Sequence, residues 1–332
     1  MIMSRVSDRL NRLSYSQTFV MSNKARDMKA AGIDVISLTL GEPDFDVPDN
    51  IKKAAFDAIN ENYSHYSPVP GFLELRKAIV NKLKRDNNLD YKPTQICVAN
   101  GAKQNIFNVL AALVNEGDEV ILPAPYWVSY DEMVKINGGV SVFIETNIDT
   151  EFKMTAEQLE AAITPKTKAV LYSSPCNPSG SYYTREELEK IANVMAKYPY
   201  VTIISDEIYE YINYDGKHTS IAEFPQVFNQ TAVINGMSKA FAMTGWRIGY
   251  SACPEWLADA CDKLQGQVTS GANTVAQRAS IVGLETDPKD YYYMVESFEK
   301  RRNLVYELLK EVPGFKVNLP KAAFYFFPDI SY

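Results

Sequence analysis

The chain has 332 residues, and at about 150 residues per domain this length predicts two domains. Its formal net charge of −7, from 34 basic and 41 acidic residues, argues against a general nucleic-acid binder, because such a protein needs a basic surface. With 46% hydrophobic and 23% charged residues, the chain is too apolar to be disordered. No apolar run approaches the roughly 20 residues of a membrane helix, so we expect no membrane partner.

The N-terminal residues carry charges every few positions and lack the apolar core of a secretory signal. The four cysteines show no CxxC spacing, and we expect reduced thiols and a cytoplasmic location. With only two histidines, His65 and His218, we expect no HExxH or multi-histidine metal site. A charge-relay hydrolase that uses one of them stays open, although nothing around either residue supports it.

Short apolar runs alternate with helical patterns along the middle of the chain. The predicted strands are 96–99, 120–122, 140–144, 169–172, 201–204 and 232–234. The predicted helices between them are 103–115, 127–136, 155–163 and 184–197. Thr184 and Glu187 form a capping box at the start of the last helix. Each strand is apolar on successive residues, as expected where both faces of a sheet are covered. The alternation predicts an α/β domain with a largely parallel sheet.

The two ends of the chain do not continue this rhythm. Residues 1–45 lack the alternation, and 291–309 form one long, charged, helix-like stretch. We therefore predict a large domain over 46–290. Residues 1–45 and 291–332 are expected to form a smaller second domain.

Ligands of parallel sheets bind where strands end and helices begin, so the residues just after each strand are candidates. A turn of small residues opens the helix at Gly101, Ala102 and Lys103. This turn either binds an anion or is only a tight structural turn. Trp127 follows the next strand, where it stacks on a planar ligand or belongs to the core. Asn177 lies in an Asn-Pro turn and either shapes that turn or donates to a ligand oxygen.

Two further strands end in ionisable side chains. Asp206 either caps a helix or meets a cationic ring nitrogen or a metal, since a buried acid is costly unless paired. Lys239 lies among small and apolar residues, where a lowered pKa would make it a Schiff-base nucleophile; the alternative is a solvated surface lysine. Arg247, eight residues later, suits a phosphate.

The chain resembles a known family. Residues 238–250 (SKAFAMTGWRIGY) are similar to the pyridoxal-phosphate lysine motif of class I aminotransferases. The segments 41–45, 101–104, 125–127, 177–180 and 205–209 match the same family in the same order. The resemblance is closest to the bacterial aspartate aminotransferases. It implies fold type I: a mostly parallel, mixed sheet sandwiched by helices, plus a smaller α/β domain from both chain ends.

The resemblance implies specific roles around pyridoxal 5′-phosphate. Lys239 would hold the cofactor as an internal aldimine and later move the proton between the substrate Cα and the cofactor. Asp206 would pair with the pyridine nitrogen and keep it protonated. Tyr209 and Asn177 would bond the phenolic oxygen, and Trp127 would stack on the ring.

The remaining implied roles concern the phosphate and the substrate. Gly101, Ala102 and Lys103, together with Ser238 and Arg247, would hold the phosphate. Gly41, Trp127 and Asn177 would lie against the substrate, with Asn177 at its α-carboxylate. Tyr66 matches a tyrosine that reaches the phosphate of a neighbouring subunit, which implies a homodimer with active sites at the interface. No metal is implied.

The chain departs from the family pattern in several places. Cys176 and Ser179 replace an Asn and a Thr of the Asn-Pro turn, and Gly236 stands where some relatives carry a phosphate-binding serine. The family places a strand of the small domain at 323–332, followed by a further segment with the arginine that clamps the substrate α-carboxylate. We therefore expect an incomplete small domain, with no residue here in that arginine's role.

The resulting expectation is ping-pong transamination between an amino acid and a 2-oxo acid. Aspartate, or a related dicarboxylic or aromatic amino acid, is the expected donor. Two alternatives stay open at this stage. One is a β-lyase or decarboxylase on the same fold, and the other is a chain that binds cofactor without turnover.

Overall fold

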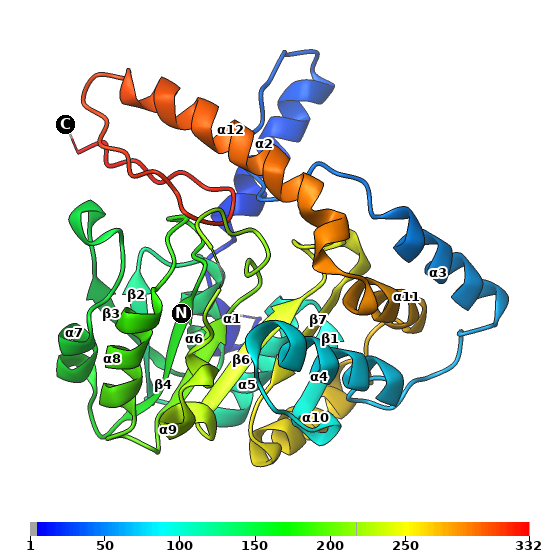
Figure 1. Cartoon of the computed structure of the whole chain (residues 1–332). Coiled ribbons are helices and arrows are strands. Elements are labelled where there is room, and N and C mark those ends of the chain that lie inside the picture. The colour runs from blue at the N-terminus through cyan, green and yellow to red at the C-terminus, as the bar shows by residue number, and fades with distance from the viewer. Residues whose placement is uncertain (1–4, 217, 332) are drawn as a thin grey trace.

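The computed structural model describes residues 5–216 and 218–331, in which seven strands form one mixed sheet (Figure 1). The strands are β1 (Ile96–Asn100), β2 (Glu119–Ala124), β3 (Val140–Glu145), β4 (Thr167–Ser173), β5 (Thr202–Asp206), β6 (Thr231–Gly236) and β7 (Ile248–Ala252). Their order across the sheet is β1-β7-β6-β5-β4-β2-β3. Strands β2 to β6 pair in parallel, whereas β7 runs antiparallel to both β6 and β1.

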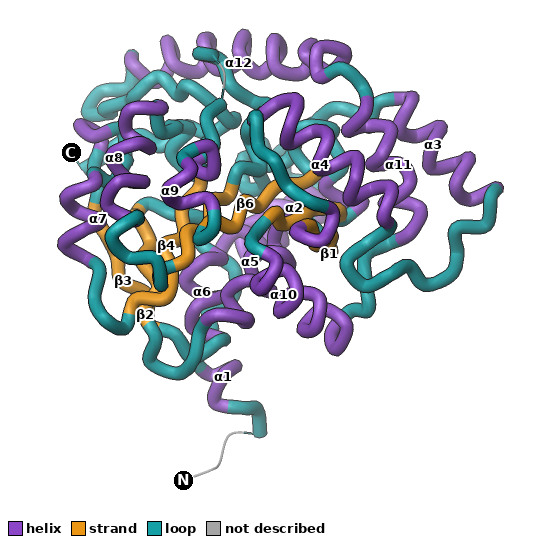
Figure 2. Tube along the Cα trace, turned by 60° about the horizontal axis from the view of Figure 1, so that its bottom comes forward, coloured by secondary structure: helices purple, strands orange, loops and turns teal. Residues whose placement is uncertain are grey.

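Helices cover both faces of this sheet (Figure 2). Their bounds are α1 (Asp8–Asn11), α2 (Gln17–Ala30), α3 (Asp49–Asn60), α4 (Leu73–Asn87), α5 (Ala102–Leu113), α6 (Ser129–Ile136), α7 (Ala156–Ala162), α8 (Arg185–Met195), α9 (Pro225–Phe228), α10 (Glu255–Val268), α11 (Thr274–Glu285) and α12 (Tyr292–Lys310). Helices α5, α6 and α10 pack on one face. Helices α7 and α8 cover one half of the other face, and α4 and α11 cover the other half. No helix among the described residues is long and apolar enough to cross a membrane.

The alternation of side chains along each strand explains this double coverage. In β4, Ala169 and Leu171 join the core beneath α5 and α6, whereas Val170 and Tyr172 join the core beneath α8. Side chains two residues apart share one face of a strand, so a continuous apolar run supplies both cores. The fold class expected from the sequence is therefore confirmed.

All six predicted strands are present, with two differences from the expectation. Strand β3 lies at the sheet edge, and Val140 and Phe143 are about half exposed, so the predicted coverage of both faces is wrong there. Strand β7 was not predicted, because its residues belong to the lysine motif and contain Gly249. The capping box is confirmed, since the Thr184 hydroxyl accepts from the Glu187 amide and the Glu187 side chain accepts from the Thr184 amide.

The C-terminal part of the chain lies across one end of the molecule. Helix α12 crosses the top of Figure 1, and the segment that follows it returns beneath the helix. Among the described residues after α12 there is no strand, only the isolated bridges Lys316–Asp329 and Asn213–Ala322. The strand implied for 323–332 is thus wrong over 323–331. Residues 1–4 and 332 of the predicted small domain lie outside the described residues.

A buried ion pair joins α4 to the turn after β5. The Lys82 ammonium donates to Glu210 and, at 2.8 Å, to the Asn87 side chain, whose own amide donates to Glu210 at 3.0 Å. Lys82 and Glu210 are 1% and 6% exposed. Such a pair adds little to the stability of the fold by itself. Loss of one partner is nevertheless costly, because the other charge then stays buried without a counter-ion.

We expect Lys82→Met to lower the free energy of unfolding by about 3–5 kcal/mol, because the Glu210 carboxylate then stays buried without its cation. Urea unfolding of the purified variant measures this loss. Lys84→Met is the matched control, since Lys84 lies two residues away on the same helix and pairs with Asp90 at the surface. Its expected cost is below about 1 kcal/mol, and equal costs for the two variants would contradict the prediction.

Candidate active site

The carboxyl ends of three adjacent parallel strands bring three predicted site residues to one edge of the sheet. Asn177 follows β4 by four residues, Asp206 is the last residue of β5, and Lys239 follows β6 by three residues. Because β4, β5 and β6 are neighbours, their ends converge. Residues from both ends of the chain cover this edge, including Gly41 and Tyr325.

Asp206 is a buried carboxylate, 4% exposed, held from two sides. The Tyr130 hydroxyl donates to its Oδ2 at 2.6 Å, and the Ile208 amide donates to its Oδ1 at 3.3 Å. Burial raises the pKa of Asp206 to about 6, whereas these two hydrogen bonds act to lower it. The residues after Asp206 form turns and no helix, so the helix-cap alternative is wrong.

Lys239 is largely withdrawn from water, which contradicts the surface-lysine alternative. Its Nζ donates to the Gly41 carbonyl at 2.6 Å and lies 5.8 and 5.9 Å from the ring centres of Tyr209 and Phe324. Burial lowers the pKa of Lys239 to about 8. A large fraction of this amine is therefore neutral and nucleophilic at mildly alkaline pH.

A cluster of hydrogen-bonding groups lies close to Lys239. The Tyr209 and Tyr325 hydroxyls lie 2.5 Å apart, and the Asn177 side-chain amide donates to the Tyr325 hydroxyl at 3.3 Å. A Cβ at Gly41 would overlap the Tyr325 hydroxyl, so only glycine fits there. Tyr325 is not among the predicted site residues, because the aromatic run that contains it resembles ordinary core.

The turn between β1 and α5 packs tightly against β7. Gly101 has a φ of +82°, and a Cβ on it would overlap the Arg247 guanidinium. A Cβ on Gly249 would overlap the backbone of Gly101 and Ala102. The two glycines therefore let the guanidinium and the first amides of α5 approach each other, which suits an anion.

The Arg247 guanidinium is fixed by the backbone on both sides. Its Nη1 donates to the Thr244 carbonyl at 2.8 Å and its Nη2 donates to the Asn100 carbonyl at 3.1 Å. Arg247 is itself exposed, so its charge faces solvent or a ligand. Ser238 is buried next to Lys239 on the same loop.

Trp127 and Lys103 lie side by side at the start of α5 and α6. The Trp127 ring meets Tyr130 edge-on, with ring centres 5.5 Å apart. The Lys103 Nζ lies 4.7 Å from the Trp127 ring and 5.8 Å from the ring of Phe19 in α2. Burial, and then the Arg247 charge, lower the pKa of Lys103.

Tyr66 stands apart from the other predicted site residues. Its side chain is 93% exposed, in the loop that joins α3 to α4 at the margin of the molecule (Figure 1). This chain alone therefore does not bring Tyr66 to the cluster around Lys239.

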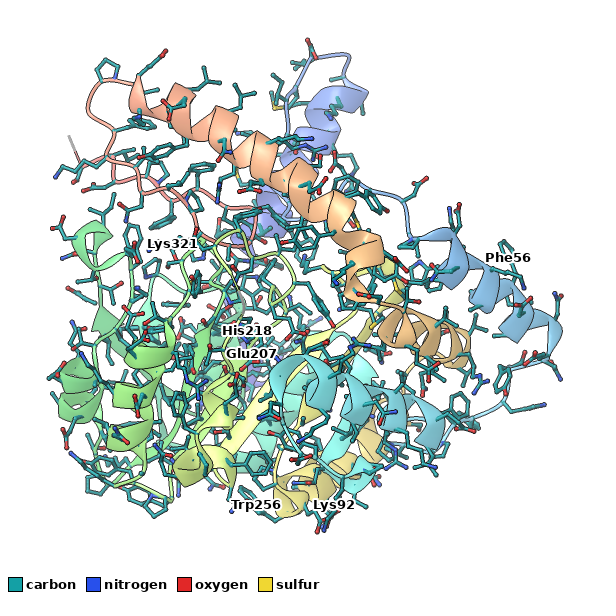
Figure 3. The ribbon with its side chains drawn as sticks, in the orientation of Figure 1. Phe56, Lys92, Glu207, His218, Trp256 and Lys321 are labelled. Atoms are coloured by element: carbon teal, nitrogen blue, oxygen red, sulfur yellow. The ribbon has the colours of Figure 1, made fainter. Side chains whose placement is uncertain are left out.

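Glu207, the neighbour of Asp206, points to a separate buried network (Figure 3). Its carboxylate accepts from the Ser205 and Ser220 hydroxyls at 2.9 and 2.7 Å and pairs with His218 Nε2 at 3.0 Å. Burial opposes the charge on His218, but Glu207 nevertheless raises the pKa of His218. This network is fully buried and satisfies its own polar groups.

These contacts remove the basis for a charge-relay hydrolase. Both serines donate to Glu207 rather than to His218, and His65 is exposed. Glu207, Glu210 and His218 lie close enough to share a cation, but the Lys82 ammonium already bonds Glu210.

We expect Lys239 in cofactor-free protein to react with acetic anhydride along a titration curve centred near pH 8, because neutral amine replaces ammonium as pH rises through its pKa. An ordinary lysine titrates near pH 10.4. Trace acetylation at several pH values, followed by mass spectrometry of the Lys239 peptide, measures the midpoint. A midpoint above pH 10 would contradict the effect of burial.

The chain is similar to known proteins over nearly its whole length. Residues 33–332 match the family model for aminotransferase class I and II. The chain is 48% identical to a probable aspartate/prephenate aminotransferase of Rhizobium leguminosarum bv. phaseoli, with 98% of this chain and 82% of that protein covered. It is also 48% identical to an aspartate aminotransferase of Bacillus sp. (strain YM-2), with 98% and 83% covered.

Solved structures agree with the sequence comparison. An aspartate aminotransferase from Rhizobium meliloti superposes with a TM-score of 0.96 at 41% identity, over 99% of this chain and 83% of that one. The Thermus thermophilus aspartate aminotransferase with maleate superposes with a TM-score of 0.95 at 38% identity, over 98% of this chain and 85% of that one.

Proposed function

We propose, since the chain belongs to the class I and II aminotransferase family, that it uses pyridoxal 5′-phosphate to exchange amino groups between a dicarboxylic amino acid and a 2-oxo acid. The chain is an aminotransferase, so its reaction is transamination. The choice of cofactor rests on one observation: the buried carboxylate of Asp206 and the largely buried amine of Lys239 lie at the same edge of the sheet, close enough to influence each other's charge, next to a turn suited to an anion.

The residues present fit this cofactor in three ways. Among the described residues Asp206 has no cationic partner within ion-pair distance, although its charge is buried, and a pyridinium nitrogen would supply that partner. Arg247 and the start of α5 offer a guanidinium and free backbone amides to a phosphate. Trp127 offers a ring face to a planar ligand.

When bound, pyridoxal phosphate supplies an electron sink for the charge that develops at the substrate Cα. The protein residues supply the rest. Lys239 would hold the cofactor and, as a neutral amine, would move the proton between the substrate Cα and the cofactor. Asp206 would keep a proton on the ring nitrogen, and the hydroxyl of Tyr209 and the amide of Asn177 would donate to the phenolic oxygen. Ser238 and Arg247, with the backbone amides of Ala102 and Lys103, would hold the phosphate.

The names of the relatives support a dicarboxylic substrate. Two are described as acting on aspartate, or on aspartate and prephenate, and the Thermus structure contains maleate, a dicarboxylate. We propose aspartate as the amino donor, with Gly41, Trp127 and Asn177 lining its place. A β-lyase or decarboxylase reaction finds no such support.

The arrangement of domains and subunits belongs to the same proposal. We propose that 46–290 form the cofactor-binding domain and that 1–45 with 291–332 form the smaller one. We also propose a homodimer, because Tyr66 is almost fully exposed on its loop. The four free cysteines, three of them buried, support a cytoplasmic location.

We expect one equivalent of aspartate to convert the aldehyde form of the bound cofactor to its amine form, with release of an equal amount of oxaloacetate. Cofactor absorbance and a coupled malate dehydrogenase assay follow the two products. Lys239→Ala should slow this half-reaction by at least about 10²–10⁴-fold, since it removes the general base. Lys92→Ala, on the surface, is the control.

Release of carbon dioxide, or of ammonia without a 2-oxo acid acceptor, would show a decarboxylase or lyase instead. An unchanged half-reaction in Lys239→Ala would contradict the assignment of Lys239.

We expect Tyr66→Ala and Lys239→Ala variants, each nearly inactive, to regain about a quarter of wild-type activity when they are mixed and allowed to exchange subunits. Half of the dimers are then hybrids, and each hybrid has one site with an intact Lys239 and an intact Tyr66 from the other subunit. Activity that stays at the sum of the two separate variants would contradict a shared site.

A further inference from the structure

We infer that Tyr130 is a positioning residue for the transamination site, because its hydroxyl holds the Asp206 carboxylate in place and in its anionic form. The inference rests on the proposed function, since Asp206 is the group proposed to pair with the cofactor ring nitrogen. Tyr130 lies in α6, outside every motif that pointed to the family.

The contact between the two side chains is short and directional. The Tyr130 hydroxyl donates to Asp206 Oδ2 at 2.6 Å, within the range of hydrogen bonds between a hydroxyl and a charged carboxylate. The Ile208 amide holds the other oxygen, Oδ1, at 3.3 Å. The two donors come from different elements, α6 and the turn after β5, so together they fix the orientation of the carboxylate.

Tyr130 is itself held rigidly. It is 1% exposed and packs in the core between α5, α6 and the sheet. Its ring meets Trp127 edge-on at an interplanar angle of 89°, and its amide donates to the Trp127 carbonyl at 2.9 Å. The start of α6 therefore places the proposed stacking ring and the anchor of Asp206 in one rigid unit.

The hydroxyl also influences the charge on Asp206. Several titratable groups lie close enough to this carboxylate to interact with its charge: Tyr130, Cys176, Glu207, Tyr209, Lys239 and Tyr325. Among them, Tyr130 and Lys239 favour the charged carboxylate, whereas burial and Glu207 disfavour it. Without the Tyr130 hydroxyl, the pKa of Asp206 would be higher. A larger fraction of Asp206 would then be protonated, and its ion pair with the ring nitrogen would be weaker.

The test compares Tyr130→Phe with Tyr183→Phe in the cofactor-loaded protein. Tyr183 is 5% exposed, borders the same small cavity as Tyr130, and its hydroxyl accepts a hydrogen bond from the Met154 amide at 2.9 Å. Both variants lose one buried hydroxyl, but only Tyr130 faces Asp206. Similar falls in Tm would therefore show that the two substitutions cost comparable stability.

We expect Tyr130→Phe to move the acid limb of the kcat/KM profile upward by about one pH unit. The Kd for pyridoxal phosphate should rise by about tenfold, and kcat at pH 7 should fall more than KM changes. Tyr183→Phe should leave all three unchanged. A 3-fluorotyrosine at position 130 keeps the ring and strengthens the donor, so it should move the acid limb downward.

The inference is wrong if Tyr130→Phe retains the wild-type profile and Kd, or if Tyr183→Phe shifts them equally. It is also wrong if fluorotyrosine moves the acid limb upward. In each of these cases the half-reaction with aspartate still depends on Lys239, so the proposed function stands. If the proposed function is wrong, the half-reaction does not depend on Lys239.

Discussion

The site depends on one buried carboxylate, Asp206, which forms no ion pair with a side chain in the part of the chain that the structure describes. Burial of a charge costs several kcal/mol unless partners compensate for the lost water. Among the residues that the structure describes, the Asp206 carboxylate accepts hydrogen bonds only from the Tyr130 hydroxyl and one backbone amide. Its neighbour Glu207, by contrast, has two hydroxyls and His218. The incomplete compensation at Asp206 leaves its charge available to a bound cation on the side of Lys239.

The same edge of the sheet depends on segments far apart in the chain. Lys239 donates to Gly41, which lies 198 residues earlier, and Asn177 donates to Tyr325, which lies 148 residues later. Helix α12 and the segment after it cover this edge, so Lys239 is removed from water and its pKa falls to about 8. The covering segments therefore supply the electrostatic environment that makes a lysine an effective base at moderate pH.

Much of this could be predicted from the sequence, because buried parallel strands leave continuous apolar runs and their ends mark ligand sites. The strand ends mark Asp206 and Lys239 as candidates, and the family resemblance assigns their roles. Tyr130 and Tyr325 were not predicted, since an aromatic residue in a helix or an aromatic run looks like core until its hydroxyl partner is known. Strand β7 was not predicted, because glycine disfavours a strand. Gly249 is needed there because α5 packs closely against the sheet at that position.

The most direct test of the account is borohydride reduction of the protein loaded with pyridoxal phosphate, followed by tryptic digestion and mass spectrometry. Reduction makes the link between cofactor and lysine permanent. The account predicts one pyridoxyl group per chain, in the peptide that contains Lys239. A pyridoxyl group on another lysine instead, such as Lys103 at the neighbouring anion-binding turn, would contradict it.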